Sequence, residues 1–191
     1  NKAKGTGLSG GGFHADFSAN SNTFLNNTAD NLSAGFVLGY NTFNNTFTGN
    51  SALNNSGSGF QISDTFSNTI TSNKAAGNYV GLYLAESAGI PTIDNILSNN
   101  TVISNNYGFR ISGTARNNII VSNIIENNAV FGADITASQN LFYNNLFNNS
   151  RNAVDMGRNQ WNITKTPGTN IIGGPFLGGN FWSDYTGRDL N

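Results

Sequence analysis

The chain has 191 residues, a formal net charge of −1 and 10% charged residues, so it lacks the basic stripe of a nucleic-acid-binding protein. It contains no cysteine, which excludes disulfides and thiolate metal sites, and no apolar run approaches the roughly 18 residues of a membrane span. Asparagine contributes 36 residues, but the 37% of apolar residues keep fixed places in a repeat, which favours one folded domain over a disordered chain.

The chain begins at Asn1 rather than methionine and shows no signal peptide, as a mature or trimmed fragment of a longer protein would. A glycine-rich segment then leads into the first copy of the repeat. We predict one domain, in which residues 1–164 form the repeated body and residues 165–191 cap its last turn. Trp182 and Tyr185 are expected to fold over that turn.

The first element of each repeat is a short strand in which a small residue, usually glycine, precedes an apolar–X–apolar triplet. Alternation at period two is typical of a strand, so the two apolar residues point to one face and the residue between them points to the other. These strands begin at residues 12, 35, 59, 81, 108, 132 and 153.

Two further strands follow from a pair of asparagines five residues apart, each with an apolar residue two places later. The pairs recur in steps of 23, 23, 27, 23 and 22 residues and begin at Asn22, Asn45, Asn68, Asn95, Asn118 and Asn140. A repeat this regular indicates a solenoid. The second apolar column grows from Ala29, Ala52 and Ala75 to Val102, Ile125 and Phe147, so the C-terminal turns should be wider or packed differently.

Asparagine at the corners is expected to adopt the left-handed backbone conformation and to hydrogen-bond to its counterparts in neighbouring turns. The sequence contains no Asn-Gly or Asp-Gly hairpin turn and no capped helical pattern. The fold class is therefore all-β, a parallel β-helix (solenoid) of about seven rungs of about 23 residues, with three short strands per rung. The predicted structural ladder consists of Asn45, Asn68, Asn95, Asn118, Asn50, Asn73, Asn100 and Asn123.

The one long step contains residues 85–91, Ala-Glu-Ser-Ala-Gly-Ile-Pro, which indicate an insertion at a corner. Insertions in solenoids collect on loops and often at binding faces. A tolerated surface loop is the alternative, and we favour it.

The repeat resembles the right-handed parallel β-helix repeats of carbohydrate-binding proteins and sugar hydrolases, and it is most similar to the NosD-like branch, named for a periplasmic protein linked to copper delivery. Residues 178–189, Gly-Gly-Asn-Phe-Trp-Ser-Asp-Tyr-Thr-Gly-Arg-Asp, are similar to the segment that often follows such repeats in archaeal and bacterial surface proteins. The resemblance implies a right-handed coil over residues 12–189. It says little about function, because relatives range from lyases to non-catalytic modules.

The outward-facing residues of the glycine-led strands provide the best catalytic candidates. This column ends in Arg110, Asp134 and Asp155, and stacking should bring the two carboxylates to about 5 Å from each other. Two close carboxylates could hold Ca²⁺ or share a raised pKa. The alternative, which we favour, is an exposed charge ladder in which Arg110 offsets Asp134.

Three other kinds of site have candidate residues in the sequence. The resemblance implies copper, but His14 is the only histidine and Met156 the only methionine, and their rungs lie near opposite ends, so no cofactor is expected beyond a possible Ca²⁺. Exposed tyrosines, chiefly Tyr83 and Tyr107, could stack on sugar rings. Glycosylation sequons occur at Asn26, Asn31, Asn44, Asn54, Asn99, Asn148 and Asn162, although a chain this rich in Asn, Ser and Thr forms sequons by chance.

The sequence favours an extracellular or cell-surface module from an archaeon or bacterium that is structural, self-assembling or adhesive rather than catalytic. Its sparse titratable groups and its repeat columns devoted to packing support this interpretation. The alternatives are a carbohydrate-binding module and a polysaccharide lyase or hydrolase using Arg110, Asp134 and Asp155. The expected partners are therefore the protein itself or a polysaccharide, with no nucleic acid and no membrane span.

Overall fold

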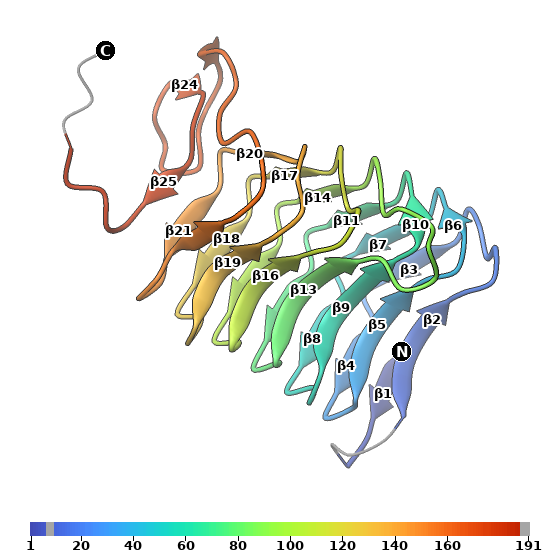
Figure 1. Cartoon of the computed structure of the whole chain (residues 1–191). Helices are drawn as coiled ribbons and strands as arrows, with labels where there is room; N and C mark the ends of the chain where they lie inside the picture. The colour runs from blue at the N-terminus through green and yellow to red at the C-terminus, as the bar shows by residue number, and fades with distance from the viewer. Residues whose placement is uncertain (7–9, 188–191) are drawn as a thin grey trace.

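A computed structural model describes residues 1–6 and 10–187, so part of the glycine-rich segment and the last four residues of the tail lie outside the described residues. The described chain is all β, and its strands stack into a solenoid of parallel sheets (Figure 1). The coil runs from the blue N-terminal strands to the orange strands near the C-terminus. The predicted fold class is confirmed.

Three parallel sheets form the sides of the coil, and each complete rung contributes one strand to each sheet, whereas the terminal rungs are incomplete. Sheet A consists of β1 (Lys2–Lys4), β4 (Thr28–Asp30), β8 (Ser51–Leu53), β12 (Lys74–Ala76), β15 (Thr101–Ile103), β18 (Ile124–Glu126), β21 (Leu146–Asn148) and β25 (Phe181–Trp182). Sheet B consists of β2 (Gly11–Ala15), β5 (Ala34–Leu38), β9 (Ser58–Ser63), β13 (Val80–Ala85), β16 (Tyr107–Ile111), β19 (Phe131–Ile135) and β22 (Ala153–Asp155). Sheet C consists of β3 (Thr23–Leu25), β7 (Thr46–Thr48), β11 (Thr69–Thr71), β14 (Ile96–Ser98), β17 (Ile119–Val121) and β20 (Leu141–Tyr143).

Two small sheets complete the fold. β6 (Thr42–Phe43) and β10 (Thr65–Phe66) pair in parallel at the corner between sheets B and C, so these rungs carry a short fourth strand that the sequence pattern did not reveal. β23 (Thr166–Pro167) and β24 (Phe176–Leu177) form an antiparallel hairpin that stands out at the C-terminal end of the coil (Figure 1).

The predicted asparagine ladders are confirmed, and the hydrogen bonds show that each ladder has a direction. The amide of Asn100 donates to Asn123 Oδ1 at 2.9 Å and to the carbonyl of Ile70 at 2.9 Å. Its own Oδ1 accepts the backbone N–H of Asn73 at 2.9 Å and the side-chain amide of Asn73 at 3.1 Å. Both amide hydrogens and both oxygen lone pairs are thus used. These hydrogen bonds offset the cost of removing the buried asparagine side chain from water.

A third ladder, which our sequence analysis did not identify, lies five residues beyond Asn50, Asn73, Asn100 and Asn123 and four residues beyond Asn145. The signal was present, because the five-residue spacing simply continues. Its members follow the same bonding pattern and are Asn55, Asn78, Asn105, Asn128 and Asn149.

The prediction that the ladder asparagines adopt the left-handed conformation is wrong. The residue immediately before each of the eight predicted ladder asparagines does so, as in Asn99 (φ 55°), Ser72 (φ 56°) and Asp94 (φ 56°), and Gly49 and Gly77 occupy equivalent positions. The left-handed residue turns the chain outward, and the following asparagine can then project inward to its ladder. The residue with positive φ therefore makes the turn, and the asparagine after it makes the ladder hydrogen bonds, whereas the sequence predicts both for the asparagine.

The interior is packed differently along the coil, as expected. Inward side chains become larger in one sheet where they become smaller in another. Where the sheet A column grows from Val102 to Ile125, the sheet B column shrinks from Phe109 to Ala133. All four side chains have no exposed surface. The exchange keeps the interior filled at constant density.

Glycine is required in the sheet B strands because the backbone of the next rung approaches closely. A Cβ added at Gly108 would lie 2.4 Å from the carbonyl oxygen of Gly132 and 2.8 Å from a methyl carbon of Ile125. Neither contact is possible for a real side chain. The glycine opening of the repeat is thus explained by packing between rungs.

Candidate site on the outer face of sheet B

The outward column of sheet B is confirmed from His14 to Asp134. It contains His14, Val37, Gln61, Tyr83, Arg110 and Asp134 in successive rungs. Arg110 Nε lies 3.1 Å from Asp134 Oδ2, so the expected offsetting ion pair forms. The Asp134 side chain is 15% exposed and that of Arg110 is 40% exposed.

The predicted neighbour of Asp134 is wrong at the last rung. Val154, not Asp155, pairs with Asp134, and Asp155 pairs with Ile135. The final turn is short, so β22 enters the sheet one residue out of the expected register, and a one-residue slip moves every side chain to the other face. The proposed Asp134–Asp155 pair, with its Ca²⁺ and catalytic interpretations, has no support in this register.

Asp155 instead closes the end of the coil. Its Oδ1 accepts the N–H of Gly157 at 2.9 Å and the amide of Asn159 at 2.8 Å, and its Oδ2 accepts Trp161 Nε1 at 2.8 Å. Asn159 is the last member of the first ladder, since it accepts the amide of Asn140. A carboxylate accepts without donating, so it ends a ladder whose donors point toward the C-terminus.

A row of aromatic rings runs along the same outer face, beside the column that contains Arg110. Tyr79 and Tyr107 have centroids 5.7 Å apart, and Tyr107 and Phe131 have centroids 6.5 Å apart. The Arg110 guanidinium lies 4.8 Å from the centroid of Tyr107, and that of Arg151 lies 5.4 Å from Phe131. Stacked guanidiniums keep several N–H donors available at the rim of the rings.

Sequence reasoning found only part of this row. Tyr83 and Tyr107 were candidates, and both lie on this face, with the Tyr83 hydroxyl 3.4 Å from Ser112 Oγ. Phe131 and Arg151 were missed. A usable signal existed for Phe131, because it directly precedes the glycine of its strand, as Tyr107 does.

The insertion is anchored to the body of the coil by a buried carboxylate that the sequence did not single out. Asp64 is fully buried, and its Oδ1 accepts the N–H groups of Ser87 at 3.0 Å and Ala88 at 2.9 Å. Its Oδ2 accepts the Ser87 hydroxyl, and its own N–H donates to Thr92 Oγ1 at 2.8 Å. One residue thus holds both the middle of the loop and the residue that follows it.

This anchor should respond to pH. Burial alone raises the pKa of Asp64, but the hydrogen bonds from the Ser87 hydroxyl and the backbone of Ala88, Ser87 and Ile90 outweigh it and lower the pKa below its ordinary value of 3.8. The ionised group therefore stabilises the loop fully above pH 3.8, and this stabilisation is lost as the pH falls through the lowered pKa.

We expect Asp64→Asn to lower the free energy of unfolding by about 1–2 kcal/mol at pH 7, since bonds to a charged acceptor are about twice as strong as bonds to a neutral one. The difference from the wild type should shrink below about pH 4. Thermal melts from pH 7 to pH 2.5 measure it, with Asp94→Asn at an exposed corner as the control. An equal difference at both pH values would contradict the assignment.

The two residues that could bind copper are far apart. His14 lies on β2 and Met156 follows β22, and these strands are the opposite edges of sheet B. His14 Nδ1 lies 3.2 Å from Asp16 Oδ2, and Met156 is 69% exposed. No group of three or more His, Cys, Asp or Glu side chains converges among residues 1–6 and 10–187. The residues present therefore do not fit a copper site within one molecule.

The sequon asparagines lie mostly at exposed corners. Asn26, Asn44, Asn54 and Asn99 are exposed and have positive φ, whereas Asn31 is half-buried. Asn148 and Asn162 are exposed outside this corner series. Glycosylation at these positions stays a prediction.

Comparisons with known proteins give one family. A family model described as periplasmic copper-binding protein (NosD) matches residues 1–91 and again residues 89–187. No curated protein and no solved structure matches the chain. The periplasmic description agrees with the localisation expected from the sequence. None of the described residues belongs to a helix long and apolar enough to cross a membrane.

Proposed function

The chain belongs to the NosD family, and on that basis we propose that it is a non-catalytic periplasmic or extracellular module that binds polysaccharide along the outer face of sheet B. The row formed by Tyr79, Tyr107 and Phe131, with Arg110 and Arg151 beside the rings, carries the proposal. Aromatic rings pack against the apolar faces of sugars, and guanidinium and amide groups bond the hydroxyls.

The direction of the row supports an extended ligand. Tyr79, Tyr107 and Phe131 come from three successive rungs: Tyr107 pairs with Phe131, and Tyr79 directly precedes Val80, the partner of Tyr107 in the preceding strand. The row therefore runs along the coil axis, with ring centroids 5.7 and 6.5 Å apart. That spacing is comparable to the length of one sugar residue in an extended chain. Because the solenoid is rigid, its backbone loses little conformational entropy when a ligand binds to such a row.

The charges favour a neutral glycan. Two arginines lie beside the rings. The charge of Arg110 is offset by Asp134, which leaves Arg151 as the other cation of this site. Binding of a polyanion normally relies on several unpaired cations. We therefore assign a polymer of uncharged hexopyranoses as the ligand class.

We expect Tyr107→Ala to weaken binding of cellohexaose or maltohexaose about tenfold or more, which corresponds to about 1.4 kcal/mol, because Tyr107 is the central ring of the row. Isothermal titration measures the affinity. Tyr143→Ala, on the outer face of sheet C, is the matched control and should bind as the wild type does. Equal losses in both variants, or polygalacturonate binding more tightly than the neutral sugars, would contradict the proposal.

Self-assembly is the competing function, and the two ends of the coil favour it. The N-terminal end carries the half-buried Phe13 and Phe24, and the C-terminal end carries Trp161 and Trp182. Unpaired strand edges accompany both sets. Light scattering over a concentration series without sugar tests this alternative, which requires growth into long species, whereas a monomer of 20.3 kDa favours the binding module.

A further inference from the structure

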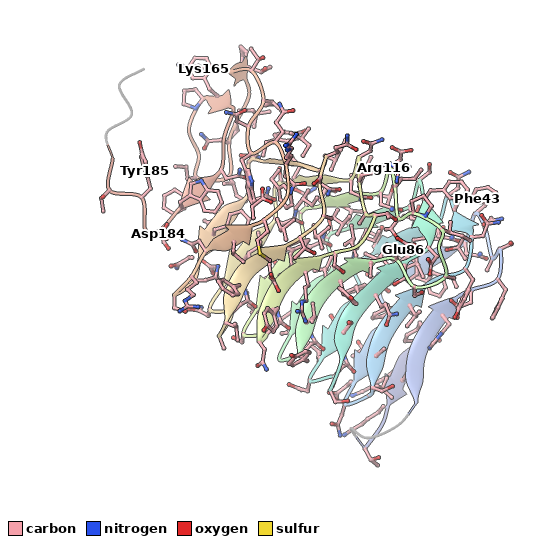
Figure 2. The ribbon with its side chains drawn as sticks, in the orientation of Figure 1. Phe43, Glu86, Arg116, Lys165, Asp184 and Tyr185 are labelled. Carbon is pink, nitrogen blue, oxygen red and sulfur yellow. The ribbon has the colours of Figure 1, made fainter. Side chains whose placement is uncertain are left out.

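A pocket lies between the tail hairpin and the corner at which the chain passes from sheet C to sheet A. It has a volume of about 330 Å³, near the lower limit for small-molecule sites. Figure 2 labels Lys165, which directly precedes β23, and the loop from β23 to β24 forms one wall of the pocket. None of the lining residues belongs to sheet B, so the pocket is separate from the aromatic row.

The corner of the coil forms the floor of the pocket. Asn99, Ser122 and Asn144 directly precede the second asparagines of three successive pairs and have φ angles of 55°, 57° and 56°. The N–H of Asn99 donates to the carbonyl of Val121 at 3.2 Å, and the N–H of Ser122 donates to the carbonyl of Tyr143 at 3.4 Å. The three side chains therefore follow one another along the coil axis, one from each rung.

The tail loop forms the opposite wall, and hydrogen bonds hold it in place. The N–H of Ile171 donates to Asn144 Oδ1 at 2.7 Å, and the Asn144 amide donates to Ser122 Oγ at 2.8 Å. Within the loop, Asn170 Oδ1 accepts the N–H of Gly174 at 2.8 Å. These bonds fix the wall against the coil before a ligand arrives, so that little conformational entropy is lost on binding.

The polar groups that the pocket offers to a ligand are uncharged. Among the described residues, the Asn99 amide and the Thr169 hydroxyl have no hydrogen-bond partner, and both side chains line the pocket. The Ser122 hydroxyl accepts from Asn144 and keeps its own proton to donate. One amide and two hydroxyls supply both donors and acceptors, which is the combination that the hydroxyls of a polyol require.

The rest of the lining excludes a charged ligand. No Asp, Glu, Lys, Arg or His lines the pocket, and its apolar side chains are Ile124 and Ile171. A charged molecule would lose hydration here without gaining a partner of opposite charge, whereas hydroxyls can exchange water for the amide and the two hydroxyls of the lining. The isoleucines can pack against the C–H groups of a sugar ring.

We propose that this pocket binds one neutral monosaccharide or cyclic polyol. Its volume corresponds to about eleven water molecules at about 30 Å³ each, which is enough for one pyranose ring with its hydroxyls. The inference does not rest on polysaccharide binding at sheet B, because the two sites share no residue. The tail thus does more than cap the coil, since it completes a binding site.

Titration of the full chain with D-glucose, D-galactose, D-mannose and myo-inositol tests the proposal, with the side-chain amide signals of Asn99 and Asn144 followed by NMR. We expect at least one of these compounds to shift both signals with saturation. Asn99→Ala and Thr169→Val should each weaken its affinity about fivefold or more, because each removes a hydrogen-bonding group. Glucuronate should bind more weakly than glucose. Unchanged melting temperatures are the evidence that the variants fold.

Asn26→Ala is the matched control and should bind as the wild type does. Asn26 is an exposed residue with a φ of 54° at the same corner, and it lies outside the pocket. Equal losses in Asn26→Ala and Asn99→Ala would therefore overturn the assignment, as would the absence of saturable binding of all four compounds. Binding that is lost in Tyr107→Ala but kept in Asn99→Ala and Thr169→Val would place the sugar on sheet B, which removes the pocket and leaves the proposed function standing.

Discussion

Replacing Asn100 by alanine is expected to lower the free energy of unfolding by about 3–6 kcal/mol. The asparagine is buried, and its side chain makes four hydrogen bonds of 2.9–3.1 Å. Alanine would leave the backbone N–H of Asn73, one amide hydrogen of Asn73 and the carbonyl of Ile70 without this partner. Each buried polar group left unsatisfied costs about 1–3 kcal/mol.

Urea denaturation measures this loss, with Asn106→Ala as the control. Asn106 is an exposed neighbour in the same rung, and its replacement should change stability by less than about 0.5 kcal/mol. Asn100→Asp separates donors from acceptors, because it keeps Oδ1 and removes the two N–H donors to Asn123 and Ile70. If Asn100→Ala cost less than about 1 kcal/mol, the ladders would be a consequence of the fold rather than a source of its stability.

Removing residues 165–191 is expected to have the second large effect, namely association or aggregation of the remaining coil. In the intact chain β25 pairs with β21, and Trp182 covers Phe147. Asn180 also extends the second ladder, since it accepts the backbone N–H and the amide of Asn145 at 3.0 and 2.9 Å. Without the tail, the edge of sheet A and the ring of Phe147 would face solvent.

Light scattering and thermal melting of residues 1–164 test this expectation. Trp182→Ala in the full chain removes the packing of this ring on Phe147 and Trp161 and should lower the free energy of unfolding by about 3 kcal/mol, the lower end of the range for Trp→Ala changes in cores. Lys165→Ala, at an exposed position directly before β23 (Figure 2), is the matched tail control and should leave the mass unchanged. A truncated chain that stays monomeric with the wild-type melting temperature would contradict the capping role and the predicted boundary at residue 165.

The direction of the asparagine ladders also affects self-assembly. The amide donors of all three ladders point toward the C-terminus, and the first and third ladders end there on Asp155 and Asp184. A second coil placed on that end would meet acceptors where it needs donors. The intact C-terminal end is therefore less suited to stacking than an end formed by truncation.

Repetition determined most of what the sequence could predict. A residue such as Asn50 has its own counterparts, Asn27 and Asn73, as its neighbours above and below, so the spacing of one residue type already implies the ladder contacts. The fold class, the rung length, the inward columns and the outward position of Arg110 beside Asp134 follow from the same property. In a solenoid, a regular period in the chain is also a period in space.

Only the tertiary structure decided the features that depart from the period. The short last turn slips Asp155 out of the column of Asp134, and no local property of residues 153–156 reveals such a slip, because either face is open to an alternating strand. The bonds from Asp64 to the insertion, and the meeting of Trp161 with Trp182, join segments that share no repeat position. Their geometry depends on how the coil ends and where its corners open, and those are properties of the packed chain rather than of its pattern.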